Sequence, residues 1–129
     1  MVASEAELLG AALPFLDAGV RAGDLVYVSG QVPVVDGKPS HLGHLGDDVD
    51  LEAGRAAART CAVNVLAALK AELGELSRVR RVVKVTGFVA STADFTDHPK
   101  VVNAASELFA DAFGAAGRHA RAAVGVAAL

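Results

Sequence analysis

Arg121 is the residue whose type and surroundings point most clearly to chemistry. It precedes a run of small and apolar residues, AAVGVAAL, so a guanidinium in this segment needs a partner. The planar fork of an arginine binds a carboxylate through two parallel hydrogen bonds, a geometry that lysine cannot reproduce. The pattern by itself predicts two roles equally: a carboxylate-binding arginine, or a structural charge in an ion pair or at a strand end.

The other reactive side chains form no pattern typical of a metal-binding or catalytic motif. His41 and His44 lie in a glycine-rich segment without a suitably spaced third ligand, and His98 and His119 are isolated. The chain has neither a nucleophile elbow nor a phosphate-binding glycine loop. We therefore expect no metal and no cofactor. The single cysteine, Cys61, cannot form an internal disulfide, and its small apolar neighbours predict a buried packing residue rather than a reactive thiol.

The composition is typical of one packed domain. Hydrophobic residues make up 53% of the 129 residues and charged residues 21%, which allows a core and argues against disorder. No stretch reaches the roughly 18–20 apolar residues of a membrane span, and the N-terminus lacks a basic leader, so we expect a cytoplasmic protein with no membrane partner. The net charge of −3 disfavours nucleic acid as a partner. The basic cluster at residues 78–84 favours a solvated strand end over a local binding patch.

The first half of the chain predicts short strands followed by a long helix. Residues 18–35 are rich in β-formers, with turn signals at Gly23-Asp24 and at Asp36-Gly37. A loop-like segment then leads to a helix over residues 51–73. Asp50 is suited to cap its start and Gly74 to end it. Its apolar face is predicted to follow the four-residue series from Cys61 to Leu73.

The second half predicts a strand, a helix and a last strand. β-Branched residues indicate a strand over Val79–Val89, and Pro99 suits the first turn of a helix that ends at Phe113. Residues 118–129, which include Arg121, indicate the final strand. This order predicts an α+β fold in which a mixed β-sheet carries both helices on one face.

Four segments, in order, resemble the Rid family, the YjgF-type imine deaminases. They are LVYVSGQVPV (Leu25–Val34), CAVNVLAALKAELGELSRVRRVVKVTGFVAS (Cys61–Ser91), DFTDHPKVVNAASELFADAFG (Asp94–Gly114) and GRHARAAVGVAAL (Gly117–Leu129). The resemblance implies a single Rid-like domain over residues 1–129 with a chorismate-mutase-like fold. It also implies a homotrimer whose three subunits close into a barrel, with clefts between neighbouring subunits that take a small carboxylate-bearing substrate.

The resemblance further implies a reaction and a set of site residues. The family hydrolyses reactive enamines and imines of the 2-aminoacrylate type to 2-keto acids and ammonia, which requires a grip on the carboxylate, an oriented water and a proton path. Arg121 matches the arginine that holds the carboxylate. Ser29 matches a serine near the cleft; its alternative role is to hydrogen-bond backbone groups at a strand end. Asn103 matches a helix asparagine that contacts the ligand or supports the cleft wall; the alternative is an exposed helical asparagine without such a role. Ala123 stands where the family often has cysteine, so it keeps only the backbone contribution.

Two departures from the family pattern bear on activity. The family's tyrosine before the first strand falls at Phe15 or Leu16, and a phenylalanine can pack against a ligand without donating a hydrogen bond. The sequence stops at Leu129, where family members continue into a last strand that carries a water-positioning glutamate. We expect either a longer natural chain or a covering of the open sheet edge by the segment Glu5–Phe15.

Three functions follow from these observations. The first is hydrolytic deamination of 2-enamine and 2-imine acids. The second is a non-catalytic trimer that binds small carboxylate metabolites through the same Arg121 cleft. The third is endoribonuclease activity, a label attached to the family, which the acidic net charge and the lack of a clear acid–base pair disfavour.

Overall fold

A short antiparallel hairpin opens the part of the chain that the computed structural model describes, residues 14–129. Strand β1 (Gly19–Ala22) pairs with β2 (Leu25–Val28) through the turn at Gly23, whose φ of 60° suits a glycine. The turn predicted at Gly23-Asp24 is therefore confirmed.

A second, smaller hairpin follows. Strand β3 (Val34–Val35) pairs with β4 (Lys38–Pro39). The turn residues Asp36 and Gly37 have φ values of 52° and 76°, the left-handed conformation that tight hairpin turns require at both central positions. The second predicted turn is also confirmed.

The long helix α2 (Leu51–Leu73) has the predicted bounds and caps. The Asp50 carboxylate accepts a hydrogen bond from the backbone N–H of Ala53 at 2.7 Å, and Gly74 ends the helix with a φ of 85°. The residues of the predicted series, from Cys61 to Leu73, are half-buried. The most deeply buried residues on α2 are all small: Ala62, which flanks that series, and Gly54 and Ala68. Leu45 approaches Gly54 closely, and Ala62 packs with Ala105 and Phe109 of the second long helix, so small side chains suit these two positions.

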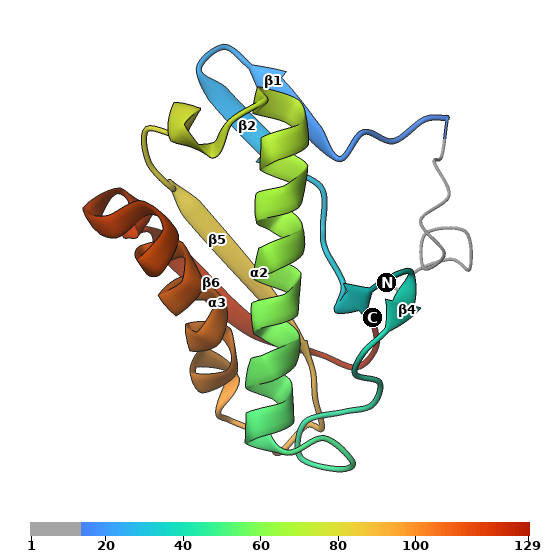
Figure 1. Ribbon diagram of the computed structural model, residues 1–129. Coiled ribbons are helices and arrows are strands. Elements are labelled where there is room, and N and C mark those ends of the chain that lie inside the picture. The colour runs from blue at the N-terminus through green and yellow to red at the C-terminus, as the bar shows by residue number, and fades with distance from the viewer. Residues whose placement is uncertain (1–13) are drawn as a thin grey trace.

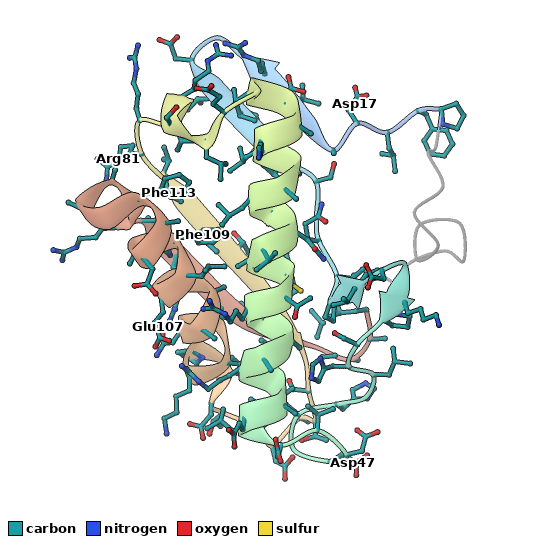
Figure 2. The ribbon with its side chains drawn as sticks, viewed as in Figure 1. Asp17, Asp47, Arg81, Glu107, Phe109 and Phe113 are labelled. Carbon is teal, nitrogen blue, oxygen red and sulfur yellow. The ribbon has the colours of Figure 1, made fainter. Side chains whose placement is uncertain are left out.

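The second helix, α3 (His98–Phe113), also has the predicted extent, and it ends in a short 3₁₀ helix, η2 (Gly114–Gly117). Its buried side chains follow helical spacing: Val101, Val102, Ala104, Ala105 and Phe109. Figure 2 shows Phe109 and Phe113 pointing from α3 into the space beside α2. The two helices therefore share one apolar core with the strand behind them.

Strands β5 (Lys84–Ala90) and β6 (Ala120–Val126) form a parallel ladder from Lys84 opposite Ala120 to Ala90 opposite Val126. The predicted start of β5 at Val79 is wrong, because a short 3₁₀ helix, η1 (Leu76–Arg78), and an extended segment precede it. Before Ala120 the chain forms the 3₁₀ helix η2, which cannot form a β-ladder with residues 79–83. The strand therefore begins only at Lys84.

Both helices cover the same face of the β5–β6 ladder (Figure 1). Val85, Val89 and Ala123 face the helices, whereas Phe88 and Val124, paired in register, point to the opposite face and are 57% and 42% exposed. The α+β, chorismate-mutase-like class with two helices on one face is thus confirmed.

The predicted single mixed sheet is divided, among residues 14–129, into three two-stranded sheets. The side-chain amide of Asn64 on α2 donates to the carbonyls of Val32 and Val34 at 3.1 and 3.0 Å. These bonds hold the segment after β2 against α2.

The edge of β6 away from β5 pairs with no strand among residues 14–129. The expected covering by Glu5–Phe15 falls almost wholly outside the described residues. Within the described part of the chain, neither helix is long and apolar enough to cross a membrane.

Candidate functional site

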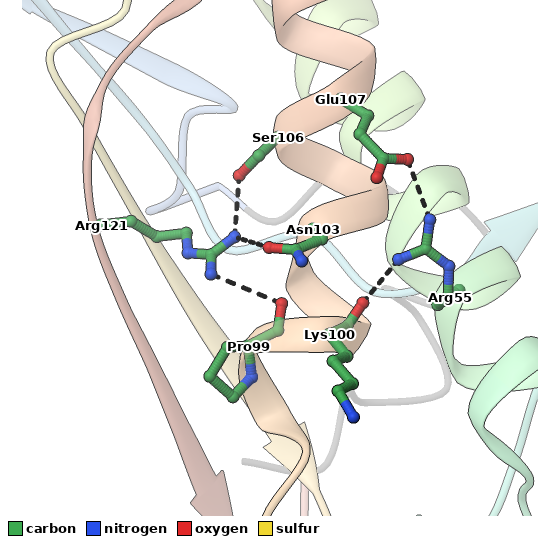
Figure 3. A network of polar contacts seen from close by, with 7 residues as sticks. All are labelled: Arg55, Pro99, Lys100, Asn103, Ser106, Glu107 and Arg121. Atoms are coloured by element: carbon green, nitrogen blue, oxygen red, sulfur yellow. Dashed lines mark hydrogen bonds and ion pairs between the residues drawn. The ribbon is translucent and has the colours of Figure 1, made fainter.

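Arg121 lies on the face of β6 that looks toward α3, and its side chain is half-buried. Its Nη1 donates to the Asn103 side-chain oxygen at 2.8 Å and to the Ser106 hydroxyl at 3.2 Å. Its Nη2 donates to the Pro99 carbonyl at 3.4 Å. We call these four residues the Arg121 cluster (Figure 3).

The three acceptors of the Arg121 cluster come from one side of one helix. Pro99, Asn103 and Ser106 are spaced by four and then three residues, which places them on the same face of α3. The helix therefore presents a row of oxygen atoms to the strand. A guanidinium bonded at both ends of such a row cannot rotate freely.

No carboxylate pairs with Arg121 among residues 14–129. The acid nearest in sequence to its acceptors, Glu107, is bound instead by Arg55 at 2.9 Å. Arg55 also donates to the Lys100 carbonyl at 2.7 Å, so a second arginine takes up this carboxylate (Figure 3). A structural ion pair, one of the two roles predicted for Arg121, is not found in the described part of the chain.

The guanidinium retains free donors on one edge. Both N–H groups of Nη1 are used by Asn103 and Ser106, and all three bonds of Arg121 run to α3 (Figure 3). Nε and the second N–H of Nη2 bond to no other residue of the range 14–129. These two groups share an edge of the guanidinium and match the two oxygens of a carboxylate. The site can therefore hold one carboxylate side-on.

Ala123 contributes backbone groups close to Arg121 on the same strand. The bonds Ala120 N–H to Val83 O and Ser91 N–H to Val126 O show that the even-numbered residues of β6 face β5. Backbone groups alternate in direction along a strand, so those of Arg121 and Ala123 point to the open edge. The methyl group of Ala123 packs on the core beside Val89.

The structure does not bring Ser29 and Phe15 to the Arg121 cluster. The Ser29 hydroxyl donates to the Asp17 carbonyl at 2.6 Å, and its backbone N–H donates to Ala18 O, so within this chain it satisfies the backbone. Phe15 is 78% exposed. Of the predicted site residues, Arg121, Asn103 and Ala123 lie together.

Sequence reasoning missed two members of this region. Ser106 lies three residues after Asn103, and His119 lies two residues before Arg121, so helix and strand periodicity place both on the site's face. His119, isolated in the sequence, hydrogen-bonds through Nε2 to the Ser106 hydroxyl at 2.9 Å. The signal was present in the spacing, but it becomes meaningful only when α3 and β6 are known to face each other.

A second serine–histidine pair lies near the other end of β6. The hydroxyl of Ser91, which is buried, is 3.0 Å from Nε2 of His98, and the ring of Phe95 stands edge-on to that imidazole. These residues line an open cavity of about 360 Å³ together with Gly125. A Cβ atom at Gly125 would lie 2.5 Å from His98 Nε2 and 2.7 Å from Ser91 Oγ, so only glycine fits there.

Among residues 14–129, no group of three or more histidine, cysteine or acidic side chains could hold a metal ion. His44 donates from Nε2 to the Ala127 carbonyl at 2.7 Å, and His41 contacts the Ser40 hydroxyl. Burial raises the pKa of the Cys61 thiol to about 11. A thiol with this pKa is a poor nucleophile at neutral pH.

Comparison with known proteins agrees with the fold. Residues 1–127 match the family described as "YjgF/chorismate_mutase-like, putative endoribonuclease". Because this match spans nearly the whole chain, the protein belongs to the YjgF, or Rid, family.

Three similar proteins extend this assignment. "Protein TCP17" of Trypanosoma cruzi is 43% identical over 136 residues, which cover 99% of this chain and 85% of that protein. The solved structure of Atu1372 from Agrobacterium tumefaciens, a protein "with unknown function", is 48% identical with a TM-score of 0.88, covering 97% of this chain and 80% of that one. A "putative endoribonuclease" from Shewanella oneidensis is 34% identical with a TM-score of 0.87, covering 92% and 79%.

Proposed function

We propose that this protein hydrolyses reactive 2-imine and 2-enamine acids of the 2-aminoacrylate type. An enamine first tautomerises to the imine, whose C=N carbon is electrophilic. Water adds to that carbon, the C–N bond of the resulting carbinolamine breaks, and a 2-keto acid and ammonia leave. The reaction consumes one water and needs no cofactor.

The observation that carries this proposal is the uncompensated guanidinium of Arg121. Neutral oxygens of Pro99, Asn103 and Ser106 hold it, and no carboxylate of the described residues neutralises it. Among residues 14–129, the edge formed by Nε and Nη2 retains donors without a partner. A half-buried arginine arranged in this way favours an anionic ligand with two oxygens, as every 2-imino acid has.

The surroundings of Arg121 supply two further groups for the reaction. The side-chain nitrogen of Asn103 remains available to orient a water or the imine nitrogen once its oxygen is bonded to Arg121. The backbone N–H of Ala123, on the open edge of β6, is suited to donate to the oxygen that forms at the reacting carbon. These roles follow the proposal and are tested with it.

We further propose that the working unit is a homotrimer with the site in a cleft between subunits. The apolar pair Phe88 and Val124 on the face opposite the helices, 57% and 42% exposed, supports burial of this face by a neighbouring copy. Ser29 and Phe15, which do not reach Arg121 in their own subunit, would then enter the neighbour's cleft.

A coupled assay tests the proposal. 2-Aminoacrylate is generated in situ, and the formation of pyruvate is compared with the uncatalysed decay. We expect wild type to accelerate hydrolysis and Arg121→Ala to lower kcat/KM by about 10- to 100-fold, the loss of a charge-assisted bond pair. If folded wild-type protein leaves the rate of 2-aminoacrylate decay unchanged, the proposed deaminase activity is refuted. A monomer mass by light scattering at micromolar concentration would refute the trimer.

Binding of a carboxylate metabolite without turnover is the second candidate function. One observation favours it: the groups that hydrogen-bond to Arg121 are neutral amide, hydroxyl and carbonyl oxygens, so none of them is a general base in direct contact. The same assay separates the two functions, because a binding protein retains pyruvate affinity and Arg121 dependence without accelerating 2-aminoacrylate decay.

A further inference from the structure

His119 makes a hydrogen bond that fixes which of its nitrogens carries a proton. Its Nδ1 lies 2.7 Å from the Gly117 carbonyl, and a carbonyl oxygen can only accept. Nδ1 is therefore the donor, and in the neutral imidazole Nε2 is left as an acceptor. The ring of Phe109 stands nearly perpendicular to the imidazole at 6.0 Å and limits its rotation.

This tautomer fixes the direction of the Ser106 hydroxyl. Its oxygen is 2.9 Å from His119 Nε2, so the single hydroxyl hydrogen points to the imidazole. Only lone pairs remain for Arg121, whose Nη1 donates to the same oxygen at 3.2 Å. The bonds form one chain from Arg121 through Ser106 and His119 to the Gly117 carbonyl, with every donor matched to an acceptor.

This chain of hydrogen bonds restricts the orientation of the Arg121 guanidinium. Without Ser106, the guanidinium would be held by Asn103 at one N–H of Nη1 and by the longer bond from Nη2 to the Pro99 carbonyl, at 2.8 and 3.4 Å. Ser106, one helical turn further, takes the other N–H of Nη1 and so defines the plane of the fork. The edge of Nε and Nη2 then keeps one direction.

We propose that Ser106 and His119 are positioning residues that orient Arg121 for the substrate carboxylate. The inference rests on the proposed function of Arg121 and deepens it. His119 acts through Ser106, and Ser106 acts through Arg121; neither touches the substrate. The pair selects ligands that present two coplanar oxygens to a fixed arginine edge, which describes the carboxylate of a 2-imino or 2-keto acid.

Ser106→Ala is the central variant, and Ser91→Ala is its matched control. Each removes a serine hydroxyl bonded to a histidine Nε2, at 2.9 and 3.0 Å respectively, but Ser91 has no bond to Arg121. We expect Ser106→Ala to raise both KM for 2-aminoacrylate and Kd for pyruvate by about 3- to 10-fold, the effect of one hydrogen bond, with kcat within about 2-fold. Ser91→Ala leaves both constants unchanged.

Two further variants distinguish a positioning role of Ser106 from an effect on the stability of the fold. Ser106→Thr keeps the hydroxyl and is expected to restore most of the affinity, whereas His119→Phe keeps a ring, removes both nitrogens and repeats the loss seen in Ser106→Ala. Thermal unfolding of each variant shows that the folded state is being compared. Unchanged KM and Kd in folded Ser106→Ala, or no rescue by threonine, would overturn the proposal.

Nuclear magnetic resonance of the unliganded protein tests the chain apart from activity. Long-range ¹H–¹⁵N spectra at neutral pH are expected to show His119 with its proton on Nδ1, and the Arg121 Nε–H signal to broaden in Ser106→Ala. A proton on Nε2 would overturn the inference. If wild type fails to hydrolyse 2-aminoacrylate but shows this tautomer and binds pyruvate, the deaminase proposal fails and the positioning role stands.

Discussion

The Ser106–His119 pair and the Ser91–His98 pair join the same chemical groups at nearly the same distance, 2.9 and 3.0 Å. Both pairs join a residue of α3, Ser106 or His98, to a residue next to the β5–β6 ladder, and they lie near opposite ends of that ladder. The first continues into the guanidinium of Arg121, whereas the second faces an open cavity of about 360 Å³.

The difference lies in what surrounds each pair. At Ser106 the helix supplies a row of acceptors and the strand supplies a cation, so the hydroxyl becomes one support of a charged site. At Ser91 the strand supplies Gly125, which leaves space and no charge. In the role proposed above for Ser106 and His119, the neighbouring residue on β6, Arg121 or Gly125, is what distinguishes the two pairs.

The largest expected effect comes from replacing the guanidinium that distinguishes the two pairs. Arg121→Lys keeps the charge but cannot form the bidentate pair of hydrogen bonds with a carboxylate. We therefore expect pyruvate affinity to fall by about 10- to 100-fold, equivalent to about 1.5–3 kcal/mol. Isothermal titration measures the change, and Arg55→Lys is the control because Arg55 binds Glu107 instead. Equal affinity of Arg121→Lys and wild type would show that the fork plays no part.

Gly125→Ala perturbs the other pair alone. The new Cβ would lie 2.5 and 2.7 Å from the ring of His98 and the hydroxyl of Ser91, so one of them must move. We expect the free energy of unfolding to fall by about 1–3 kcal/mol, the usual cost of overpacking, with little change in pyruvate affinity. Urea unfolding and titration on the same sample would contradict the comparison if stability holds while affinity falls.

Asn103→Asp tests whether the lack of a counter-ion matters at the first pair. A carboxylate at this position would lie about where the amide oxygen is now, 2.8 Å from Arg121 Nη1, and would neutralise the guanidinium. We expect pyruvate affinity to fall by about 5- to 10-fold with no loss of thermal stability. An affinity equal to that of wild type would indicate that the free charge of Arg121 is not what attracts the ligand.

Cys61 on α2 belongs to neither pair, so its substitution is expected to have the smallest effect on binding. We expect Cys61→Ala to leave pyruvate affinity unchanged. Burial raises the pKa of the thiol from 9.0 to about 11, so labelling by a thiol reagent at pH 8 should be about 100-fold slower than for an exposed cysteine. Rapid labelling of the native protein would show that the thiol is not protected.

The same pKa gives a pH dependence of stability with a definite sign. The folded state holds the thiol proton more tightly than the unfolded state, so stability is lost as the pH rises from about 9 to about 11. Wild type should lose up to about 2–3 kcal/mol more than Cys61→Ala across this interval. Parallel urea unfolding curves at pH 8 and pH 11 measure the difference, and equal losses would contradict it.

Local features were predictable because their causes are local. Asp50 and Gly74 delimit α2 through bonds to residues within four positions, and the turn at Asp36-Gly37 needs only its own backbone angles. The start of β5 was not predictable from β-branched content, because a strand begins where its partner begins. That partner, β6, starts at Ala120, thirty-six positions beyond Lys84.

The site divides in the same way. The sequence alone determined that Arg121 is an arginine in an apolar segment and that Asn103 stands on a helix, and its family resemblance connected the two. Only the tertiary structure decided that Glu107 pairs with Arg55 and that Ser106 and His119, thirteen positions apart, meet beside Arg121. The physical reason is register: a shift of β6 by one residue would turn Arg121 to the opposite face of the ladder, and no local pattern sets that alignment.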